Sequence, residues 1–364
     1  MSDPNSTVQR QEYSLFSWIP TSMRAFEEAE KRLLSFVKYL RETRFVPVRR
    51  GAAQLLTIRA APPPEADPDA ASRTPLVLLH GFGSGVGLWA GNLDALAKRR
   101  TVYAFDLLGF GRSSRIPFSR EPALVEHEWV QSIEEWRVQM KLEKFILLGH
   151  SLGGYLASAY ALAHPDSVRH LILVDPWGFP AQAQETDRQV ELPAWVRALA
   201  TVLQTFNPLA SLRAAGPWGP SMIKRVRPDL GRKFAVVGID PDDVFDYIYH
   251  CNAQSPSGES AFKVLTIPFG WAKRPMIERF PSIRQDVPTT FIYGYRSWID
   301  PGPGYEMQYE FRKQSYVRVE MIKNAGHHVY IDQPELFGQL VNEVGDIVDQ
   351  NQDQLQEGTS TSYA

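Results

Sequence analysis

The stretch with the clearest chemical content is the pentapeptide GHSLG at 149–153, which matches the pattern G-x-S-x-G. It follows an apolar run at 145–148 that is typical of a buried strand, and after Gly154 comes a helix-forming segment at 155–164. On such a tight strand-to-helix turn the serine hydroxyl is presented to substrate, and backbone N–H groups at the helix start can stabilise an oxyanion. The pattern therefore predicts a nucleophilic Ser151, with the side chain of His150, at the variable position, pointing away from it.

A serine hydroxyl becomes a strong nucleophile only when a base removes its proton and an acid orients that base. For a serine on this kind of turn, the chain order is serine, acid, histidine. Asp300 follows a strand-like run at 289–294, and the carboxyl ends of parallel strands are where such sheets assemble their sites. Asp300 is therefore the expected acid, and Asp175, which ends the run at 168–175, is the alternative.

The expected base is His327, in the loop after a strand-like run at 317–323, and His328 is the less favoured candidate. Two backbone N–H groups are expected to form the oxyanion hole. One belongs to Leu152, directly after the serine, and the other to Phe82, in a glycine-rich turn after a buried strand.

The elements that must hold these residues alternate between strand and helix. This alternation predicts an α/β fold with a mostly parallel central sheet and helices on both faces. It stops at 177–285, which is rich in Pro, Trp and Arg, and we interpret that segment as an inserted helical lid. The other expected elements are strands at 75–79 and 102–106 and helices at 88–98, 124–140, 193–203, 242–252 and 333–348. The expected domains are an N-terminal segment (1–44), a core in two parts (45–176 and 286–348), the lid (177–285) and a disordered tail (349–364).

The N-terminal segment carries large apolar side chains in a polar context. Phe16 and Trp18 precede a stretch in which Thr21 or Ser22 can cap a helix with apolar residues along one side of 26–40. Such a helix either packs on the core of its own chain or lies on a lipid surface. Because tryptophan prefers the membrane interface, the sequence favours a lipid-surface anchor with Phe16 and Trp18 as membrane contacts.

Composition excludes several classes of function. The 364 residues include 39 Lys and Arg and 41 Asp and Glu, a net charge of −2, which provides no overall basic field for nucleic acid. Cys251 is the single cysteine, so an internal disulfide and a cysteine-based metal cluster are excluded. Neither a secretory signal nor an apolar run of about 20 residues is present, which indicates a soluble or peripheral protein.

Two competing kinds of site are disfavoured by spacing. Glycines at 81–85 follow a strand-like run and Asp106 ends the next one, as in dinucleotide-binding proteins, but no G-x-G-x-x-G register fits. The histidine pairs lack the spacing of metal ligands, and His327 and His328 would face apart on a loop. We therefore expect neither a cofactor nor a metal ion.

Beyond these residues, the chain resembles the animal abhydrolase domain-containing proteins 4 and 5, within the α/β-hydrolase superfamily. The resemblance covers nearly the whole chain, and its last four motifs fall in the expected lid, where hydrolases in general share little. The motifs are PLVLLHGFG at 75–83, YAFDLLGFGRSS at 103–114, SIEEWR at 132–137, LILVDPWGFP at 171–180, FNPLA at 206–210, YIYHCN at 247–252, PSGESAFK at 256–263 and GWAKRPM at 270–276.

The resemblance implies activity on lipids, with two branches that differ in chemistry. The type 4 branch keeps the serine and resembles a lysophospholipase acting on N-acyl phosphatidylethanolamines. The type 5 branch has asparagine there and activates a patatin-type triglyceride lipase. Ser151 matches the hydrolytic branch, which implies a serine hydrolase of lipid acyl esters, yet Arg296 and Gly326 match positions linked to lipase activation in type 5.

The resemblance also implies partners and a location. The implied partners are a lipid substrate, a lipid-droplet or membrane surface, a triglyceride lipase and a lipid-droplet coat protein, and the implied location is cytoplasmic and peripheral on lipid droplets or intracellular membranes. The family has further been credited with lysophosphatidic acid acyltransfer through a His-x4-Asp motif, which His327 and Asp332 match. A capping box of Asp332 and Glu335 at a helix start would explain Asp332 without chemistry.

Overall fold

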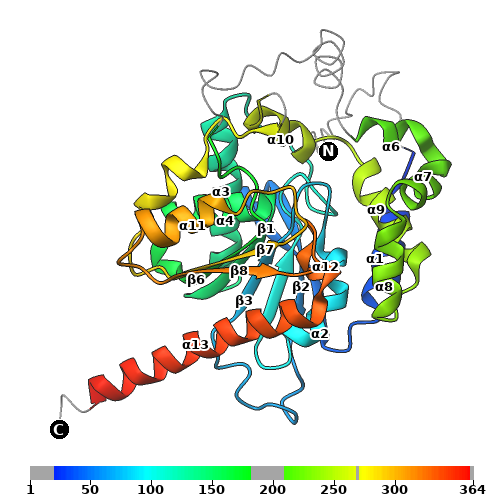
Figure 1. Ribbon diagram of the computed structural model, residues 1–364. Coiled ribbons are helices and arrows are strands. Elements are labelled where there is room, and N and C mark those ends of the chain that lie inside the picture. Colours follow the sequence, from blue (N-terminus) through cyan, green and yellow to red (C-terminus); the bar gives the residue numbers. More distant parts are fainter. Residues whose placement is uncertain (1–19, 182–208, 268–269, 361–364) are drawn as a thin grey trace, which may run out of the picture.

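The sheet at the centre of the molecule explains where the site residues meet. The computed structural model describes residues 20–181, 209–267 and 270–360, with side chains as far as residue 350. In this part of the chain eight strands form one sheet in the order β1-β2-β4-β3-β5-β6-β7-β8 (Figure 1). β1 and β4 pair antiparallel with β2, and all other neighbours are parallel. The strands are β1 (Leu40–Val48), β2 (Ala53–Ala60), β3 (Leu76–Leu79), β4 (Val102–Phe105), β5 (Phe145–His150), β6 (Val168–Val174), β7 (Thr289–Gly294) and β8 (Val317–Ile322).

Helices cover both faces of this sheet. Successive side chains of a strand point to opposite faces, so those of each central strand enter two different hydrophobic cores. Leu76 and Leu78 of β3 belong to one buried cluster, whereas Val77 and Leu79 belong to another. The first cluster includes side chains of α2 (Ala90–Leu96) and α13 (Pro334–Ser360), and the second includes side chains of α3 (Pro122–Gln139) and α4 (Leu152–Ala163). The expected fold, a mostly parallel sheet between two helical layers, is confirmed.

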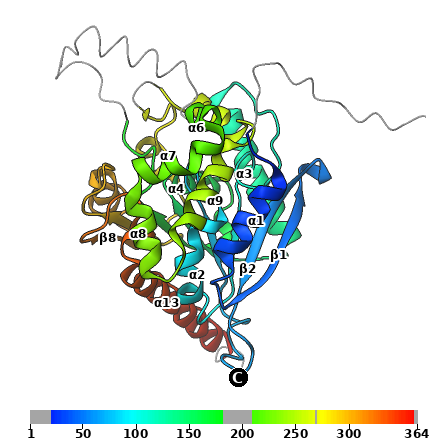
Figure 2. The same ribbon diagram turned by 90° about the vertical axis from the view of Figure 1, so that its right-hand side faces the viewer.

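Between β6 and β7 the described chain is helical, and we call residues 177–285 the lid segment. Most of its helices form a group beside α1 (Met23–Leu34), whereas its last helix lies apart from them near α3 (Figures 1 and 2). The predicted helix at 242–252 is present as α9, and the one predicted at 193–203 lies outside the described residues. The described helices are α6 (Ala210–Ala215), α7 (Gly219–Val226), α8 (Pro228–Val236), α9 (Pro241–Ala253) and α10 (Gly258–Leu265).

Helix α1 packs on the core of its own chain, which corrects the expectation of a lipid-surface anchor for this helix. Ser22 caps it by accepting a hydrogen bond from the N–H of Ala25 at 3.1 Å. Its apolar side, including Phe26 and Leu33, is fully buried in the core cluster that also contains α9 side chains. Burying that face within the protein removes the apolar surface with which a helix would enter lipid. The predicted membrane contacts Phe16 and Trp18 lie outside the described residues.

The C-terminal helix is longer than the sequence predicted. α13 runs to Ser360, whereas we expected a helix ending near Val348 and a disordered tail at 349–364. Its first part is amphipathic, with Phe337 and Val341 buried against the sheet. Beyond Val348 the helix sequence is polar except for Leu355, and the helix there satisfies its own backbone hydrogen bonds.

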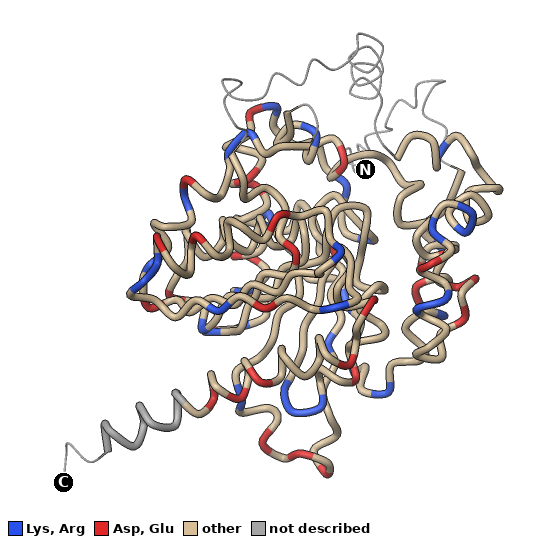
Figure 3. The backbone as a smooth tube through the Cα atoms, viewed as in Figure 1, with Lys and Arg blue, Asp and Glu red and all other residues tan. Residues whose placement is uncertain are grey.

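The described chain has a mixed charge distribution, with acidic and basic residues interleaved along most elements (Figure 3). The exception is α13, whose charged residues in the figure are all acidic. Within the described residues, none of the helices has the length and apolar character needed to cross a bilayer.

Candidate active site

Ser151 lies on a strained turn between β5 and α4. Its backbone has φ 54° and ψ −116°, a left-handed conformation that is costly for a residue with a side chain. The flanking glycines allow this turn because it brings backbone atoms very close together. A Cβ atom on Gly149 would lie 2.2 Å from the carbonyl oxygen of Gly153, and one on Gly153 would lie 2.4 Å from that of Leu79. The predicted strand-turn-helix arrangement around Ser151 is therefore present.

His327 connects Ser151 to a buried carboxylate. Nε2 of His327 lies 3.0 Å from Oγ of Ser151, and Nδ1 of the same ring lies 2.7 Å from Oδ2 of Asp175. The Asp175 side chain is fully buried, and that of His327 is 16% exposed. A carboxylate beside Nδ1 favours the tautomer with its proton on that nitrogen, so Nε2 is left to accept the proton of the serine.

Asp175 is itself fixed by two further donors. It directly follows β6, with φ 46°, and the N–H of Gly294 at the end of β7 donates to its Oδ1 at 3.1 Å. The hydroxyl of Ser297 donates to Oδ2, the oxygen that also faces His327. These two donors fix the orientation of the carboxylate toward the imidazole.

Asp300, the expected acid, does not contact His327 in the structure. It is exposed, and its Oδ1 accepts the N–H of Gly302 at 2.9 Å, where α11 (Gly302–Glu306) begins. Asp300 lies in the loop beyond Gly294, the last residue of β7, whereas Asp175 directly follows β6, the neighbour of β5 in the sheet. The geometry corrects the expectation: Asp175, the alternative from the sequence, occupies the position expected for Asp300.

The turn at 80–83 lies against the nucleophile, as expected for an oxyanion hole. A Cβ atom on Gly81 would lie 2.8 Å from Nδ1 of the buried His150 and 3.1 Å from Cβ of Ser151, so a glycine favours this approach. Leu152 is the first residue of α4, where backbone N–H groups have no partner within the helix. In the described chain, no hydrogen bond is seen from the N–H of Phe82 or of Leu152. Both donors can thus serve an incoming oxygen.

His150 has a role that the sequence did not indicate, although its side chain does point away from Ser151. Its Nε2 lies 2.9 Å from the backbone carbonyl oxygen of His327, so the residue next to the nucleophile also holds the loop of the base. Burial, followed by the neighbouring charge of His327, lowers the pKa of His150 well below its ordinary value. Burial likewise lowers the pKa of His328 to about 3. Neutral rings beside the base avoid repelling the imidazolium that forms during catalysis.

Arg296 and Gly326 lie on two adjoining loops next to the base. The N–H of Arg296 donates to the carbonyl oxygen of Ala325 at 2.8 Å, and its guanidinium donates to Oδ1 of Asn324 at 3.0 Å. The Arg296 side chain is exposed. The structure thus places the two residues together, and their part in lipase activation stays a prediction.

Asp332 is not the helix cap that we expected. It lies in α12 (Val329–Asp332), its Oδ2 accepts the N–H of Gly326 at 2.6 Å, and its Oδ1 lies 2.5 Å from Nζ of Lys233. Asp332 therefore supports the loop of the base through its backbone. Because the imidazole of His327 faces Asp175 and Ser151, the His-x4-Asp motif does not pair its two side chains.

Aromatic rings of the lid segment flank the oxyanion turn. The ring of Phe262 on α10 lies 4.6 Å from that of Phe82 and 4.7 Å from that of Trp177. On the solvent side, Trp298 is 70% exposed and its ring lies 5.1 Å from that of His327. The nucleophile is therefore bordered by apolar rings on one side and by an exposed tryptophan on the other.

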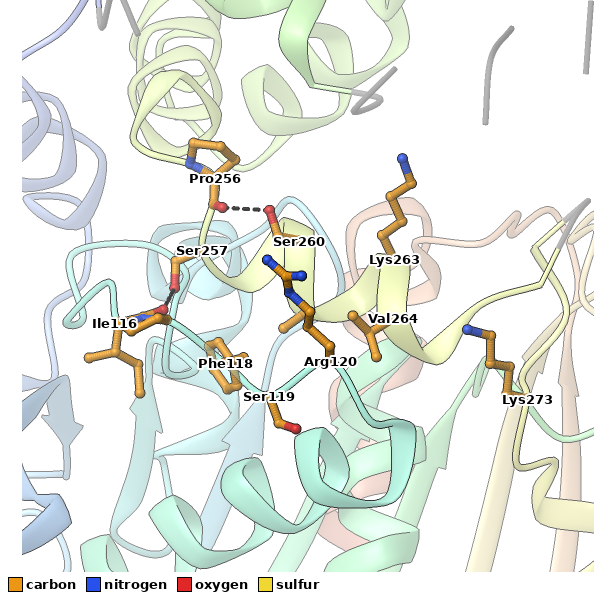
Figure 4. A pocket seen from close by; sticks show the side chains of 12 residues that line it. Ile116, Phe118, Ser119, Arg120, Pro256, Ser257, Ser260, Lys263, Val264 and Lys273 are labelled. Carbon is orange, nitrogen blue, oxygen red and sulfur yellow. Dashed lines mark hydrogen bonds between the residues drawn. The ribbon is translucent and has the colours of Figure 1, made fainter. Parts of the chain in front are cut away.

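A separate cavity of about 550 Å³ lies at α10 and has no residue of the Ser151 site in its lining (Figure 4). Phe118 and Val264 give it apolar walls, and the basic side chains of Arg120, Lys263 and Lys273 stand around it. Phe262 of the same helix contacts Phe82 at the oxyanion turn, so α10 separates the two sites.

A known protein family covers most of this chain. The profile of the alpha/beta hydrolase fold family matches residues 74–334. The chain belongs to this family. It is 50% identical over 329 residues to the (lyso)-N-acylphosphatidylethanolamine lipase of Bos taurus, covering 90% of this chain and 94% of the relative. It is also 49% identical over 329 residues to the human 1-acylglycerol-3-phosphate O-acyltransferase ABHD5, covering 90% and 92%.

Solved structures of other proteins share the fold at lower identity. A bacterial membrane phospholipase A has a TM-score of 0.59 at 19% identity and covers 91% of this chain and 93% of its own. Naproxen esterase from Bacillus subtilis has a TM-score of 0.58 at 17% identity and covers 89% and 99%. At such identities these structures support the fold alone, whereas the two relatives above place the chain in the abhydrolase domain-containing group.

Proposed function

We propose that this protein is a serine hydrolase of lipid acyl esters, of the (lyso)phospholipase type. The observation that carries the proposal is the pair of contacts made by His327, 3.0 Å to Oγ of Ser151 and 2.7 Å to Oδ2 of Asp175. Nucleophile, base and acid within hydrogen-bond reach are what covalent acyl transfer requires.

Each group has one task in the proposed reaction. Oγ of Ser151 attacks the acyl carbonyl carbon while Nε2 of His327 takes the hydroxyl proton, and the N–H groups of Leu152 and Phe82 stabilise the oxyanion. The intermediate collapses as the imidazolium gives its proton to the leaving alcohol oxygen, which leaves the acyl group on Ser151. A water molecule, deprotonated by His327, then attacks this ester and releases the fatty acid.

A lipid substrate at a membrane or lipid-droplet surface agrees with the surroundings of the site. Tryptophan and tyrosine side chains prefer the water–lipid interface, and Trp298 and Tyr295, both 70% exposed, lie in the loop beside the base. The bovine relative carries the name of a (lyso)-N-acylphosphatidylethanolamine lipase, which supports N-acyl phosphatidylethanolamines and their lyso forms as substrates. We infer that the protein works in the cytoplasm, peripherally bound to such a surface.

A fluorophosphonate probe tests this proposal, because it reacts covalently only with an activated serine. Wild-type protein should be labelled, mass spectrometry should locate the adduct on Ser151, and Ser151→Ala should abolish labelling. Thermal melting of both proteins serves as the folding control. Folded wild-type protein that remains unlabelled at Ser151 would overturn the proposal.

A second candidate function is co-activation of a patatin-type triglyceride lipase on lipid droplets, together with a droplet coat protein. It is favoured by the exposed Arg296, whose loop adjoins that of Gly326. Arg296→Ala should abolish stimulation of such a lipase on emulsified triglyceride and leave probe labelling unchanged. Unaltered stimulation by this variant would contradict the role assigned to Arg296.

Acyl transfer to lysophosphatidic acid is a variant of the same chemistry. The name of the human relative supports it, and the acyl group on Ser151 could pass to an alcohol instead of water. The contacts of Asp332 with Gly326 and Lys233 give no support to a mechanism in which Asp332 assists His327 directly.

A further inference from the structure

A continuous line of polar contacts joins the lid segment to the loop of the base. It begins at Lys233 on α8, whose Nζ lies 2.5 Å from Oδ1 of Asp332. Oδ2 of the same carboxylate accepts the N–H of Gly326 at 2.6 Å. Gly326 is the residue directly before His327. The side chain of Lys233 is therefore linked to the backbone of His327 through two polar contacts and one peptide bond.

Burial makes this carboxylate dependent on its lysine. The Asp332 side chain is only 7% exposed, and the Lys233 side chain is 33% exposed. Among the described residues, Lys233 is the one basic side chain within ion-pair distance of Asp332, and Arg227 at the start of α8 interacts with Asp332 electrostatically from farther away. A carboxylate this far from water is costly without a countercharge, so its orientation depends on the position of Lys233.

The position of Lys233 in turn depends on how α8 packs. Phe234, the next residue, is 2% exposed, and together with Leu230 it belongs to the core cluster that contains Tyr330 and Ile331 of α12. Lys233 is also tied to its own helix through Asp229, at 3.2 Å. α8 and α12 are neighbours (Figure 1). The packing of α8 therefore positions the ammonium group of Lys233 next to Asp332.

We propose that Lys233 is a positioning residue for His327, acting through Asp332 and the N–H of Gly326, so that the seating of the lid helix α8 sets the alignment of the base. The inference rests on the proposed serine hydrolase function. When α8 is seated, the paired carboxylate holds Gly326 and thereby the start of the base loop. When α8 shifts, the carboxylate loses its nearest countercharge and turns toward water, and the imidazole loses its alignment with Ser151. The seating of α8 thus sets the chemical competence of the site.

Neutral replacement of Lys233 tests the proposal, and the chain offers a matched control. Lys233→Met keeps the length of the side chain and removes the charge. Lys224→Met removes a lid lysine that is 58% exposed and pairs with Asp242, away from the base. Because small misplacements of a catalytic group can cost up to roughly 100-fold, we expect fluorophosphonate labelling of Lys233→Met to slow by roughly 10- to 100-fold. Lys224→Met should label at the wild-type rate.

Steady-state kinetics separate positioning from substrate binding. With a soluble short-chain ester, Lys233→Met should lower kcat and leave KM near the wild-type value, and Lys233→Arg should restore most of kcat. The double variant Lys233→Met with Asp332→Asn should be little worse than Asp332→Asn alone, since residues in one pathway are not additive. Thermal melting verifies folding of each variant.

Hydrogen exchange at the amide of Gly326 gives a readout that does not require activity. We expect faster exchange at Gly326 in Lys233→Met than in wild type or Lys224→Met. If wild-type protein fails to label, the hydrolase proposal fails, and the exchange rates still show whether the contact path exists. Equal labelling and equal exchange in Lys233→Met and Lys224→Met would overturn the inference, as would fully additive effects in the double variant.

Discussion

The position of the acid gives the sharpest test of the site, because two aspartates compete for the role. Asp175→Asn changes one atom in the contact network of a fully buried side chain. Oδ1 continues to accept the N–H of Gly294, so the amide nitrogen takes the place of Oδ2. Nδ1 of His327 then faces a donor instead of an acceptor. The imidazole must therefore carry its proton on Nε2, the nitrogen that faces Ser151.

An imidazole in this tautomer cannot accept the serine proton, so the loss should be nearly complete. The same substitution in chymotrypsin-type proteases costs about 10⁴-fold in kcat through the wrong tautomer, and we expect a similar loss here. That factor corresponds to about 5 kcal/mol of transition-state free energy. Asp300→Asn removes an exposed carboxylate that caps its own turn, and its activity should stay within about twofold of wild type because surface substitutions have small effects.

Hydrolysis of a lysophospholipid and the rate of fluorophosphonate labelling measure both variants. Denaturant unfolding shows whether Asp175→Asn remains folded, and the exposed Asp300→Asn is its matched control. A strong loss in Asp300→Asn together with retained activity in Asp175→Asn would refute the assignment of the acid.

Two further predictions concern the surroundings of the site. His150→Ala removes the donor to the carbonyl oxygen of His327. Labelling at Ser151 should therefore slow by about tenfold, and the free energy of unfolding should fall by roughly 1–3 kcal/mol. Unchanged labelling and unchanged denaturant unfolding would contradict this role of His150. Glu30 on α1 contacts Arg112 at 2.7 Å, and burial, followed by the charge of Asp106, raises its pKa to about 8 from an ordinary value of 4.5. The folded state therefore binds more protons than the unfolded state between these values, and stability should decrease as pH rises through that window. Urea unfolding near pH 5 and near pH 8 should reveal this slope in wild type and a flatter one in Glu30→Gln, whereas equal slopes would count against the raised pKa.

The fold and the nucleophile could be predicted from sequence because their signals are local. The apolar run of β5, the glycines at 149 and 153 and the following helix all lie within one short segment, and steric crowding at the turn demands those residue types. The strand-like runs for β3, β4, β6, β7 and β8 likewise agree with the structure within one residue at each end.

The sequence alone could not identify the acid of the triad, because this depends on which of the two loops lies next to His327 in the folded protein. Asp300 and Asp175 both follow buried strands, and chain order allows either one. What decides is that β6 lies next to β5 in the sheet, and that Gly294 and Ser297 donate to Asp175 from the neighbouring strand end. The location of α1 could not be predicted from sequence either, because its apolar side fits a lipid surface and a protein core equally well. The structure decides between them, since α9 covers that side.

The two proposed functions share a loop, and this limits which variants can separate them. Gly326 adjoins the base, and its N–H is held by Asp332, so a large side chain there would press on the carboxylate that supports His327. A Cβ atom alone would lie 3.4 Å from Oδ2 of Asp332, an ordinary contact, so Gly326→Ala should be tolerated whereas bulkier replacements should slow labelling as well. Arg296, by contrast, extends to the surface and bonds Asn324 through its side chain. Lipase activation and hydrolysis are therefore separable through Arg296, and through Gly326 only with the smallest substitution.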